Sequence, residues 1–220
     1  MTEVVIPVKD LSQAKGRLQN VLNRAERAQL VLAMLHDLLN ALQSCRVGNI
    51  WLVAHDEAVH SLGTRFGARM VHEVQSRGYN HAVSTGLQTV DPEHSVVVLP
   101  ADVPLARPED IARLMALPIG PSVGIIPDRH NRGTNGLFLS SPHIIKPAFG
   151  PNSLFDHKIA AAKAGSAATI VPSHSMAMDI DCADDLFALA QSGVKCATTA
   201  FLNSIEISQK RADQHNWSVA

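Results

Sequence analysis

The sequence of 220 residues is poor in cysteine, holding only Cys45, Cys182 and Cys196, with no CxxC pair among them. Three widely spaced cysteines indicate neither a disulfide framework nor a zinc site, and we interpret them as buried or incidental thiols. Long hydrophobic runs are missing too, since no apolar stretch approaches the roughly 18 residues of a membrane helix. The N-terminus, with Glu3 and Lys9 around a short strand, is no signal peptide, so we expect a cytoplasmic protein.

The chain also lacks an excess of either charge, because 19 Lys and Arg face 20 Asp and Glu. This balance gives no support to a nucleic-acid-binding surface, so a highly anionic ligand must be met by local cations and metal ions. Eleven histidines are scattered without HExxH spacing and indicate no metal site. With 46% hydrophobic residues and no linker, we expect one domain over residues 1–195, followed by a C-terminal helix and tail at 196–220.

Strand-like and helix-like patterns alternate along the chain. This alternation predicts an α/β fold, a single domain with a mainly parallel sheet flanked by helices. Strands are expected at 3–8, 50–54, 69–72, 96–99, 122–126, 169–172 and 176–180. Helices are expected at 23–42, 57–66, 81–90, 108–118, 154–164 and 197–207, with a loose tail from residue 209.

The central element is the apolar stretch Val96 to Leu99, which reads as a strand buried on both faces. Asp102 follows it, at the carboxyl edge where open α/β sheets bind ligands. A lone carboxylate there suggests a metal ligand. The alternative is that Asp102 caps a turn before the helix that begins at Pro108.

The first strand runs into a loop that carries Lys9, Lys15 and Arg17. Three cations in nine residues suit a polyphosphate, whose oxygens they neutralise together with backbone N–H groups. The glycines of a Walker A or GxGxxG loop are missing. A solvated basic loop is the alternative.

Three further segments suggest contacts to a ligand. Gly78 and Asn80 precede a helix, where they can bring backbone groups close to a base or phosphate, unless Asn80 only caps the helix. The longest polar run, residues 128–136, lies between two apolar strands and offers the hydroxyl of Thr134. Near Ser153, free N–H groups at a helix start can hold a phosphate, unless Ser153 is only a cap.

Asp179 and Asp181 bracket an isoleucine in a segment predicted to be extended. Residues i and i+2 of a strand point to the same face, so both carboxylates can converge on one cation while Ile180 turns into the core. A divalent ion is the simplest compensation for two adjacent acids. Helix capping is the alternative for Asp181.

Taken in order, these segments resemble the 2-phospho-L-lactate guanylyltransferase family, over about Val4 to Leu186. The family activates a small phosphorylated acid with GTP in biosynthesis of the deazaflavin coenzyme F-420. The residues that carry the resemblance are Pro7-Val8-Lys9, Ala14 to Leu18, Gly78-Tyr79-Asn80, Leu99 to Pro104, Asp128-Arg129 with Gly133-Thr134-Asn135, Phe149 to Ser153, and Asp179-Ile180-Asp181.

The resemblance implies a nucleotide-diphospho-sugar-transferase-like (Rossmann-like) fold and assigns residues to three ligands. Magnesium is held by Asp102, Asp179 and Asp181, and the acceptor's phosphate or carboxylate is bound by Thr134, Gly150 and Ser153. The nucleotide is expected to contact Pro7, Lys9, Lys15, Arg17, Gly78, Asn80, Pro100 and Ala101. The catalytic residues are Asp102, Lys15 and Arg17.

The family's acceptors are 2-phospho-L-lactate, phosphoenolpyruvate and 3-phospho-D-glycerate, and the sequence does not choose among them. Two positions depart from the family pattern. Tyr79 stands where an aliphatic residue is usual, and Gly136 where alanine is usual. Both are expected near the base and acceptor pockets.

The reaction joins the acceptor's phosphate to the α-phosphorus of GTP and releases pyrophosphate. A phosphate monoester carries about −1.5 to −2 charge at pH 7, so no general base or covalent serine is required. Holding two polyanions together is the difficulty, and magnesium and the cationic loop address it. Arg77, Arg129 and Arg132 are further candidates for anion contacts.

Two other functions are compatible with these features. One is a nucleotidyltransferase acting on a sugar phosphate or molybdopterin, which would use the same metal. The other is a non-catalytic GTP-sensing domain, against which the three carboxylates argue. A homodimer and hand-over of product to the downstream deazaflavin transferase are compatible with the sequence.

Overall fold

The computed structural model describes residues 1–73, 75, 77–117 and 120–210 of the chain. Within these residues, seven strands form one sheet in the order β3-β2-β1-β4-β6-β5-β7. The strands are β1 (Thr2–Pro7), β2 (Ile50–Ala54), β3 (Arg69–His72), β4 (Ser95–Val98), β5 (Val123–Pro127), β6 (Thr134–Leu139) and β7 (Ala168–Ile170). The mainly parallel α/β sheet predicted from the sequence is confirmed.

One strand runs against the others. β6 pairs antiparallel with both β4 and β5, while the other four pairings are parallel. Its first residue, Thr134, therefore lies at the edge where β1 and β4 end. The register shifts between Ile126, opposite Gly136, and Pro127, opposite Thr134, so Asn135 is an extra residue in β6. Such a bulge turns the side chain of the residue before it, here Thr134, to the opposite face of the sheet.

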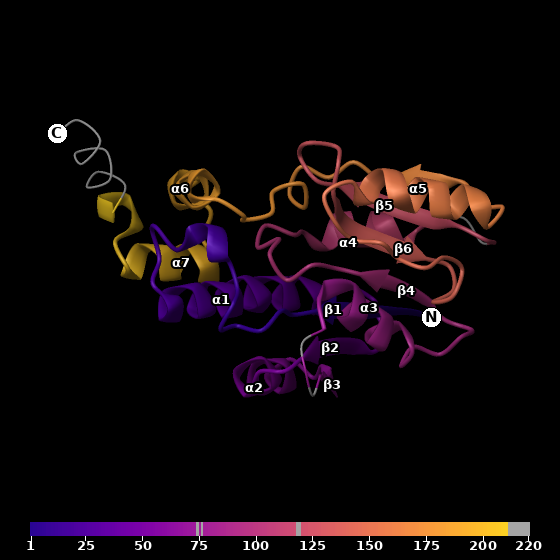
Figure 1. The fold of residues 1–220 in the computed structure, drawn as a ribbon, viewed down its shortest axis with the longest axis horizontal. Helices are drawn as coiled ribbons and strands as arrows, with labels where there is room; N and C mark the ends of the chain where they lie inside the picture. The colour runs from indigo at the N-terminus through magenta and orange to yellow at the C-terminus, as the bar shows by residue number, and fades with distance from the viewer. Residues whose placement is uncertain (74, 76, 118–119, 211–220) are drawn as a thin grey trace.

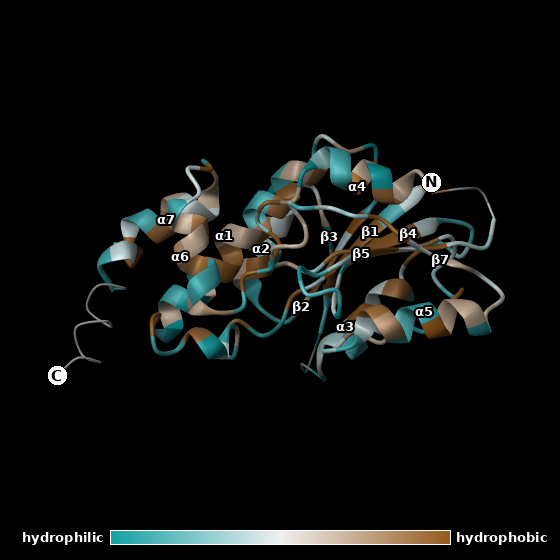
Figure 2. Ribbon diagram, turned by 90° about the horizontal axis from the view of Figure 1, so that it is seen from above, coloured by the Kyte–Doolittle hydropathy of each residue, from teal (hydrophilic) through white to brown (hydrophobic). Residues whose placement is uncertain are grey.

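Helices cover both faces of the sheet. They are α1 (Arg24–Leu42), α2 (Glu57–Arg65), α3 (Tyr79–Leu87), α4 (Pro108–Met115), α5 (Ser153–Lys163), α6 (Ala183–Gln191) and α7 (Ala197–Ser204), with a short 3-10 turn, η1, at Gly16–Leu18. Figure 1 shows the order of the elements, and Figure 2 shows α4 on one side of the strands with α3 and α5 on the other. The core is divided accordingly into two clusters of buried side chains.

α1 illustrates how the sequence specifies a local element. The Asn23 side chain accepts the N–H of Glu26, and the Glu26 carboxylate accepts the N–H of Asn23. This capping box satisfies N–H groups that the helix leaves without intrahelical partners. The predicted apolar face is confirmed, because Leu30, Met34 and Leu38 are fully buried, as are other residues at the same spacing.

β1 and β4 lie at the centre of the sheet, and their side chains are buried on both faces. Val4, Val5, Val97 and Val98 have no exposed surface. A strand covered by helices on both sides needs an uninterrupted apolar sequence, and this is the pattern that singled out Val96 to Leu99. The central strand therefore holds the following segment, Pro100 to Asp102, at a fixed edge.

Several predicted elements differ from the observed ones. Residues 176–180 form no strand: Ala177 donates its N–H to Ser173 and Ile180 donates its N–H to Asp102, away from any ladder. Residues 134–136, read as loop because they are polar, begin β6. The helix from Pro108 ends at Met115, and its predicted end at residue 118 lies outside the described residues.

The C-terminal helix, α7, is held against α1 by hydrogen bonds. Asp37 of α1 accepts hydrogen bonds from the backbone of Ala197 and Thr198, at 2.8 Å each, and Leu202 is fully buried. The helix ends at Ser204 rather than at 207. The domain boundary after residue 195 stays a prediction, and most of the predicted tail lies outside the described residues. Among the described helices, none is long and apolar enough to cross a membrane.

Candidate functional site

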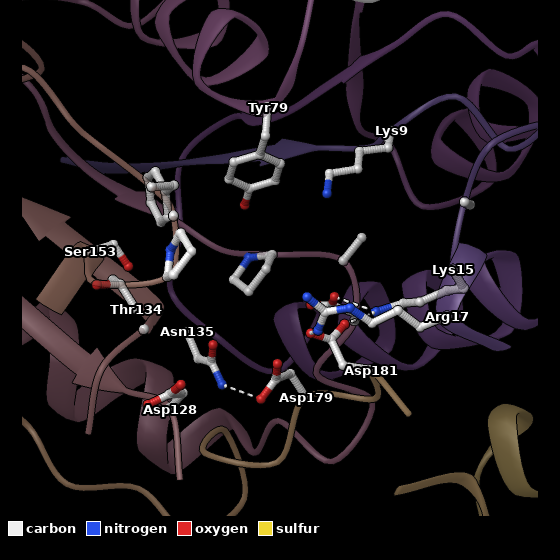
Figure 3. A pocket seen from close by; sticks show the side chains of 18 of the residues that line it. Lys9, Lys15, Arg17, Tyr79, Asp128, Thr134, Asn135, Ser153, Asp179 and Asp181 are labelled. Carbon is white, nitrogen blue, oxygen red and sulfur yellow. Dashed lines mark hydrogen bonds and ion pairs between the residues drawn. The ribbon is translucent and has the colours of Figure 1, made fainter. Parts of the chain in front are cut away.

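A cleft of about 750 Å³ opens at the carboxyl edge of β1 and β4. Its volume is within the usual range for small-molecule sites. The predicted site residues line it except Gly78 and Asn80; of the three further arginine candidates, Arg129 and Arg132 line it and Arg77 does not. Figure 3 shows Thr134 and Ser153 on one side of the cleft, and Lys15, Arg17 and Asp181 on the other.

The ammonium of Lys15 lies between two of the predicted metal ligands. Its Nζ is 2.6 Å from an oxygen of Asp102 and 2.9 Å from an oxygen of Asp181, and the side chain is 10% exposed. Lys15 adopts a left-handed conformation, with φ at 50°. A residue other than glycine is rarely found there, and such conformations concentrate at functional sites. The alternative, that Asp102 caps a turn before α4, is not observed, because its carboxylate pairs with Lys15 and the N-cap of α4 is Arg107.

The third carboxylate, Asp179, is held by an amide. Asn135 donates from Nδ2 to Asp179 at 3.2 Å and to the carbonyl of Met176 at 2.9 Å. Ile180 is buried, as predicted, although the segment is not a strand. Burial raises the pKa of Asp179 above its usual range, and the carboxylates of Asp102 and Asp181 add to the shift. This repulsion is what a bound cation relieves.

The donor set suits magnesium, a hard cation that takes carboxylate oxygens. Burial alone would raise the pKa of Asp181, but Lys15 and Arg17 hold it below its usual range. In the described part of the chain, no three Asp, Glu, His or Cys side chains already surround a common point as a metal site. Lys15 fills the space between Asp102 and Asp181, so a metal ion there would take its place.

A buried pair holds the segment that carries Asp181. Asp185 accepts the N–H groups of Asp181 and Cys182, at 2.8 and 2.9 Å, and pairs with the guanidinium of Arg129 at 2.6 Å. Cys182 is the N-cap of α6, so the helix-cap alternative for Asp181 is wrong. The guanidinium of Arg129, a predicted candidate for a substrate contact, pairs with this carboxylate in the structure.

Hydroxyl and backbone groups gather on the opposite side of the cleft. Thr134 and Ser153 are buried there, and Gly150 lines the same wall. Because of the bulge at Asn135, Thr134 points towards α5, where its hydroxyl lies 3.0 Å from Nδ1 of His157. Ser153 is the first residue of α5, after the N-cap Asn152. Donors at a helix start suit an anion.

Asn80 does not line the cleft and has a structural partner, Phe149. It accepts the N–H of Phe149 at 2.7 Å and donates to the carbonyl of the same residue at 2.8 Å. The N-cap of α3 is Gly78, at φ 97°, so Asn80 does not cap the helix. Asn80 instead fixes the segment that leads to Gly150. Its role in nucleotide binding stays a prediction.

The two departures from the family pattern lie in different places. Tyr79 lines the cleft, with its ring 5.2 Å from that of Phe149, and its hydroxyl is buried without a hydrogen-bond partner. Gly136 does not line the cleft, and a Cβ there would meet Leu114 and Ile126 at 3.2 to 3.3 Å. Gly136 therefore adjoins the cleft through Asn135, which lines it, while its own face is turned to the core.

Tyr79→Phe is expected to stabilise the ligand-free protein by about 1 kcal/mol. On folding, the buried Tyr79 hydroxyl loses its hydrogen bonds to water and gains none within the protein. For a chain of this size, the melting temperature should rise by roughly 2 to 4 °C. Tyr79→Leu is the control, since it removes the ring contact with Phe149 and should lower stability. Thermal unfolding without nucleotide measures both, and an unchanged or lower melting temperature for Tyr79→Phe would contradict the prediction.

Three residues of the site had no predicted role: Asn135, His157 and Asp185. Each contacts a residue far from it in the sequence: Asn135 contacts Asp179, His157 contacts Thr134, and Asp185 contacts Arg129. Local signals existed for two of them. His157 stands four residues after Ser153, on the same helix face, and Asp185 occupies the third position of α6, where a side chain accepts the cap N–H.

Comparison with known proteins agrees with the geometry. The family model described as "Guanylyl transferase CofC like" matches residues 2–219. A phosphoenolpyruvate guanylyltransferase of Roseiflexus castenholzii is 35% identical over 187 residues, covering 85% of this chain and 87% of that protein. A 3-phospho-D-glycerate guanylyltransferase of Phenylobacterium zucineum is 32% identical over 213 residues, covering 94% and 97%.

Solved structures show the same fold. A Desulfovibrio desulfuricans G20 protein assigned to the nucleotide-diphospho-sugar transferases superposes with a TM-score of 0.74 at 17% identity, covering 95% of this chain and 97% of that one. A 4-diphosphocytidyl-2C-methyl-D-erythritol synthase of Anaerococcus prevotii gives 0.61 at 13% identity, covering 92% and 96%. The predicted fold family is confirmed.

Proposed function

Since the chain belongs to the family of CofC-like guanylyl transferases, we propose that it transfers GMP from GTP to the phosphate of a three-carbon phospho-acid and releases pyrophosphate. The observation that carries the proposal is the cleft itself. It has two cations and three carboxylates on one side, and buried hydroxyl donors on the other. The relatives are enzymes, so a non-catalytic GTP sensor is not favoured.

The cationic side suits the triphosphate. Lys15 and Arg17 come from η1 and the turn before it, and Lys9 follows β1. Their charges would stabilise the α-phosphorus under attack and the departing pyrophosphate. Pro7, Pro100 and Ala101 line the cleft at the ends of the central strands and would contact the nucleoside.

Magnesium is the cofactor we propose, held by Asp102, Asp179 and Asp181. When bound, it neutralises phosphate charge and aligns the two reactants. The chain's own part is to hold these carboxylates in place. Asn135 fixes Asp179, and Asp185 fixes the backbone of Asp181.

The acceptor would lie against Thr134, Gly150 and Ser153. Its phosphate is already ionised near pH 7, so the protein has only to orient it towards the α-phosphorus of GTP. Buried donors do this without adding negative charge. The acceptors under consideration are phosphoenolpyruvate, 3-phospho-D-glycerate and 2-phospho-L-lactate, and we place the product in coenzyme F-420 biosynthesis.

The direct test is pyrophosphate release with magnesium, with GTP compared to ATP, CTP and UTP across these three acids. Release with GTP and one acid is expected. Release only with another nucleotide, or only with a sugar phosphate or molybdopterin, would assign a different nucleotidyltransferase. GTP binding without pyrophosphate release from any acceptor would favour the sensor.

Ser153→Ala is expected to raise the Michaelis constant of the acceptor by about 10- to 100-fold, the usual effect of losing one hydrogen bond to a charged group. The Michaelis constant of GTP should change far less. Ser84→Ala, at an exposed position on α3, is the matched control. Steady-state kinetics with each substrate varied in turn measures the effect, and equal changes in both constants would place Ser153 elsewhere.

Two properties beyond the reaction itself stay predictions. One is that the protein forms a homodimer, and the other is that it hands its product to the downstream deazaflavin transferase. The product joins two phosphates in an anhydride, and such a reactive compound would favour direct transfer.

A further inference from the structure

His157 is a buried residue that the proposed reaction does not use. It lies on the inner face of α5, has no exposed surface, and both ring nitrogens have partners. Nδ1 is 3.0 Å from the hydroxyl oxygen of Thr134, and Nε2 is 3.0 Å from the backbone nitrogen of Ala148.

The partners determine where the ring proton lies. A backbone N–H can only donate, so Nε2 of His157 accepts from Ala148. Burial lowers the pKa of His157 to about 4, so near pH 7 the ring carries a single proton. That proton must be on Nδ1, from which it is donated to the oxygen of Thr134. The Thr134 hydroxyl then has its own hydrogen left to donate elsewhere.

The same ring connects the two segments that form the acceptor side of the cleft. Thr134 begins β6, and Ala148 lies two residues before Gly150. The ring of Phe149 also packs edge-on against His157, with 4.9 Å between centroids. One imidazole therefore fixes the position of both segments and the orientation of the Thr134 hydroxyl.

We propose that His157 is a positioning residue for the acceptor: its Nδ1–H tautomer occupies the Thr134 oxygen, so that the hydroxyl hydrogen points to an anionic oxygen of the substrate. The substrate in this inference rests on the proposed function. The tautomer follows from the hydrogen bonds of His157 in this structure. With one lone pair of its oxygen occupied by His157, the Thr134 hydroxyl is oriented as a donor. An anionic phosphate or carboxylate oxygen is the strongest acceptor for that hydrogen.

His157→Phe and His157→Gln separate this role from a merely structural one. Phenylalanine fills the space without either hydrogen bond, and it is expected to raise the acceptor's Michaelis constant by about 10- to 100-fold. Glutamine offers one accepting and one donating atom, and it should restore most of the affinity. The Michaelis constant of GTP should stay within about threefold in both variants. His143→Gln, at an exposed position, is the control.

The tautomer is tested without activity, by ¹⁵N NMR of histidine-labelled wild-type protein near pH 7. We expect one resonance pair with a protonated Nδ1 and an unprotonated Nε2, absent from His157→Gln. A protonated Nε2, or a charged ring, would overturn the proposal even if the enzyme is active. Equal rises in both Michaelis constants, or no rise in His157→Phe, would also overturn it. Failure of the wild-type enzyme with every acid, with the tautomer confirmed, would instead refute the proposed function.

Discussion

Replacement of Asp102 by asparagine should lower the turnover number by about three orders of magnitude. A bound metal supplies several kcal/mol of transition-state stabilisation, and each 1.4 kcal/mol or so corresponds to a tenfold change in rate. Asp102 lies at the centre of the carboxyl edge, between the cationic loop and Asp179. Pyrophosphate release under saturating substrates and magnesium measures the effect.

The stability of Asp102→Asn should change little, because the side chain keeps its volume and Lys15 keeps its second partner, Asp181, at 2.9 Å. Asp184→Asn is the matched control: it removes one negative charge from an exposed position on α6. Its activity should be that of the wild type. Near-normal turnover in Asp102→Asn would contradict the proposal that Asp102 holds a metal ion.

Lys15→Met should change two properties in opposite directions. Turnover with GTP is expected to fall by about 100- to 1,000-fold, since a fixed cation at the triphosphate is lost. Binding of magnesium alone should become tighter, because the ammonium that fills the space between Asp102 and Asp181 is gone. The three carboxylates would then lose their buried counter-charge and keep Arg17, which lies 3.6 Å from Asp181 and is largely exposed.

The metal effect is measured without nucleotide, as the rise in melting temperature with magnesium chloride. The rise should be larger in Lys15→Met than in the wild type. Lys163→Met, at an exposed position near the end of α5, is the control for loss of one positive charge. An unchanged or smaller response to magnesium would show that Lys15 and the metal do not compete.

The elements with strong local signals were predicted well from the sequence. The capping box at Asn23 and the apolar spacing after it located α1, and β2 was placed at Ile50–Ala54 as observed. Residues 176–180 were predicted as a strand because their apolar side chains resemble one, and they form no strand. Their backbone groups bond instead to Ser173, Asp102 and Asn135, which no local pattern reveals.

The same limit applies to the site. Carboxylates after apolar strands and cations in a loop are visible in sequence, and the structure brings them together in one cleft. The supporting contacts are not visible. Asn135 and Asp179 are 44 positions apart, and Thr134 and His157 are 23 apart, so each pair is made by the fold. A side chain that orients another leaves little trace in the chain's local pattern.

The bulge at Asn135 limits which sequence changes this region can accept during evolution. The extra residue decides that Thr134 faces α5 and the cleft while Gly136 faces Leu114 in the core. Deleting Asn135 would restore regular pairing and leave Thr134 opposite Pro127, on the same face as before, but it would remove the amide that holds Asp179. A deletion at the bulge would therefore spare the orientation of Thr134 while removing the support of a carboxylate across the cleft, so the extra residue ties the start of β6 to the segment that carries Asp179.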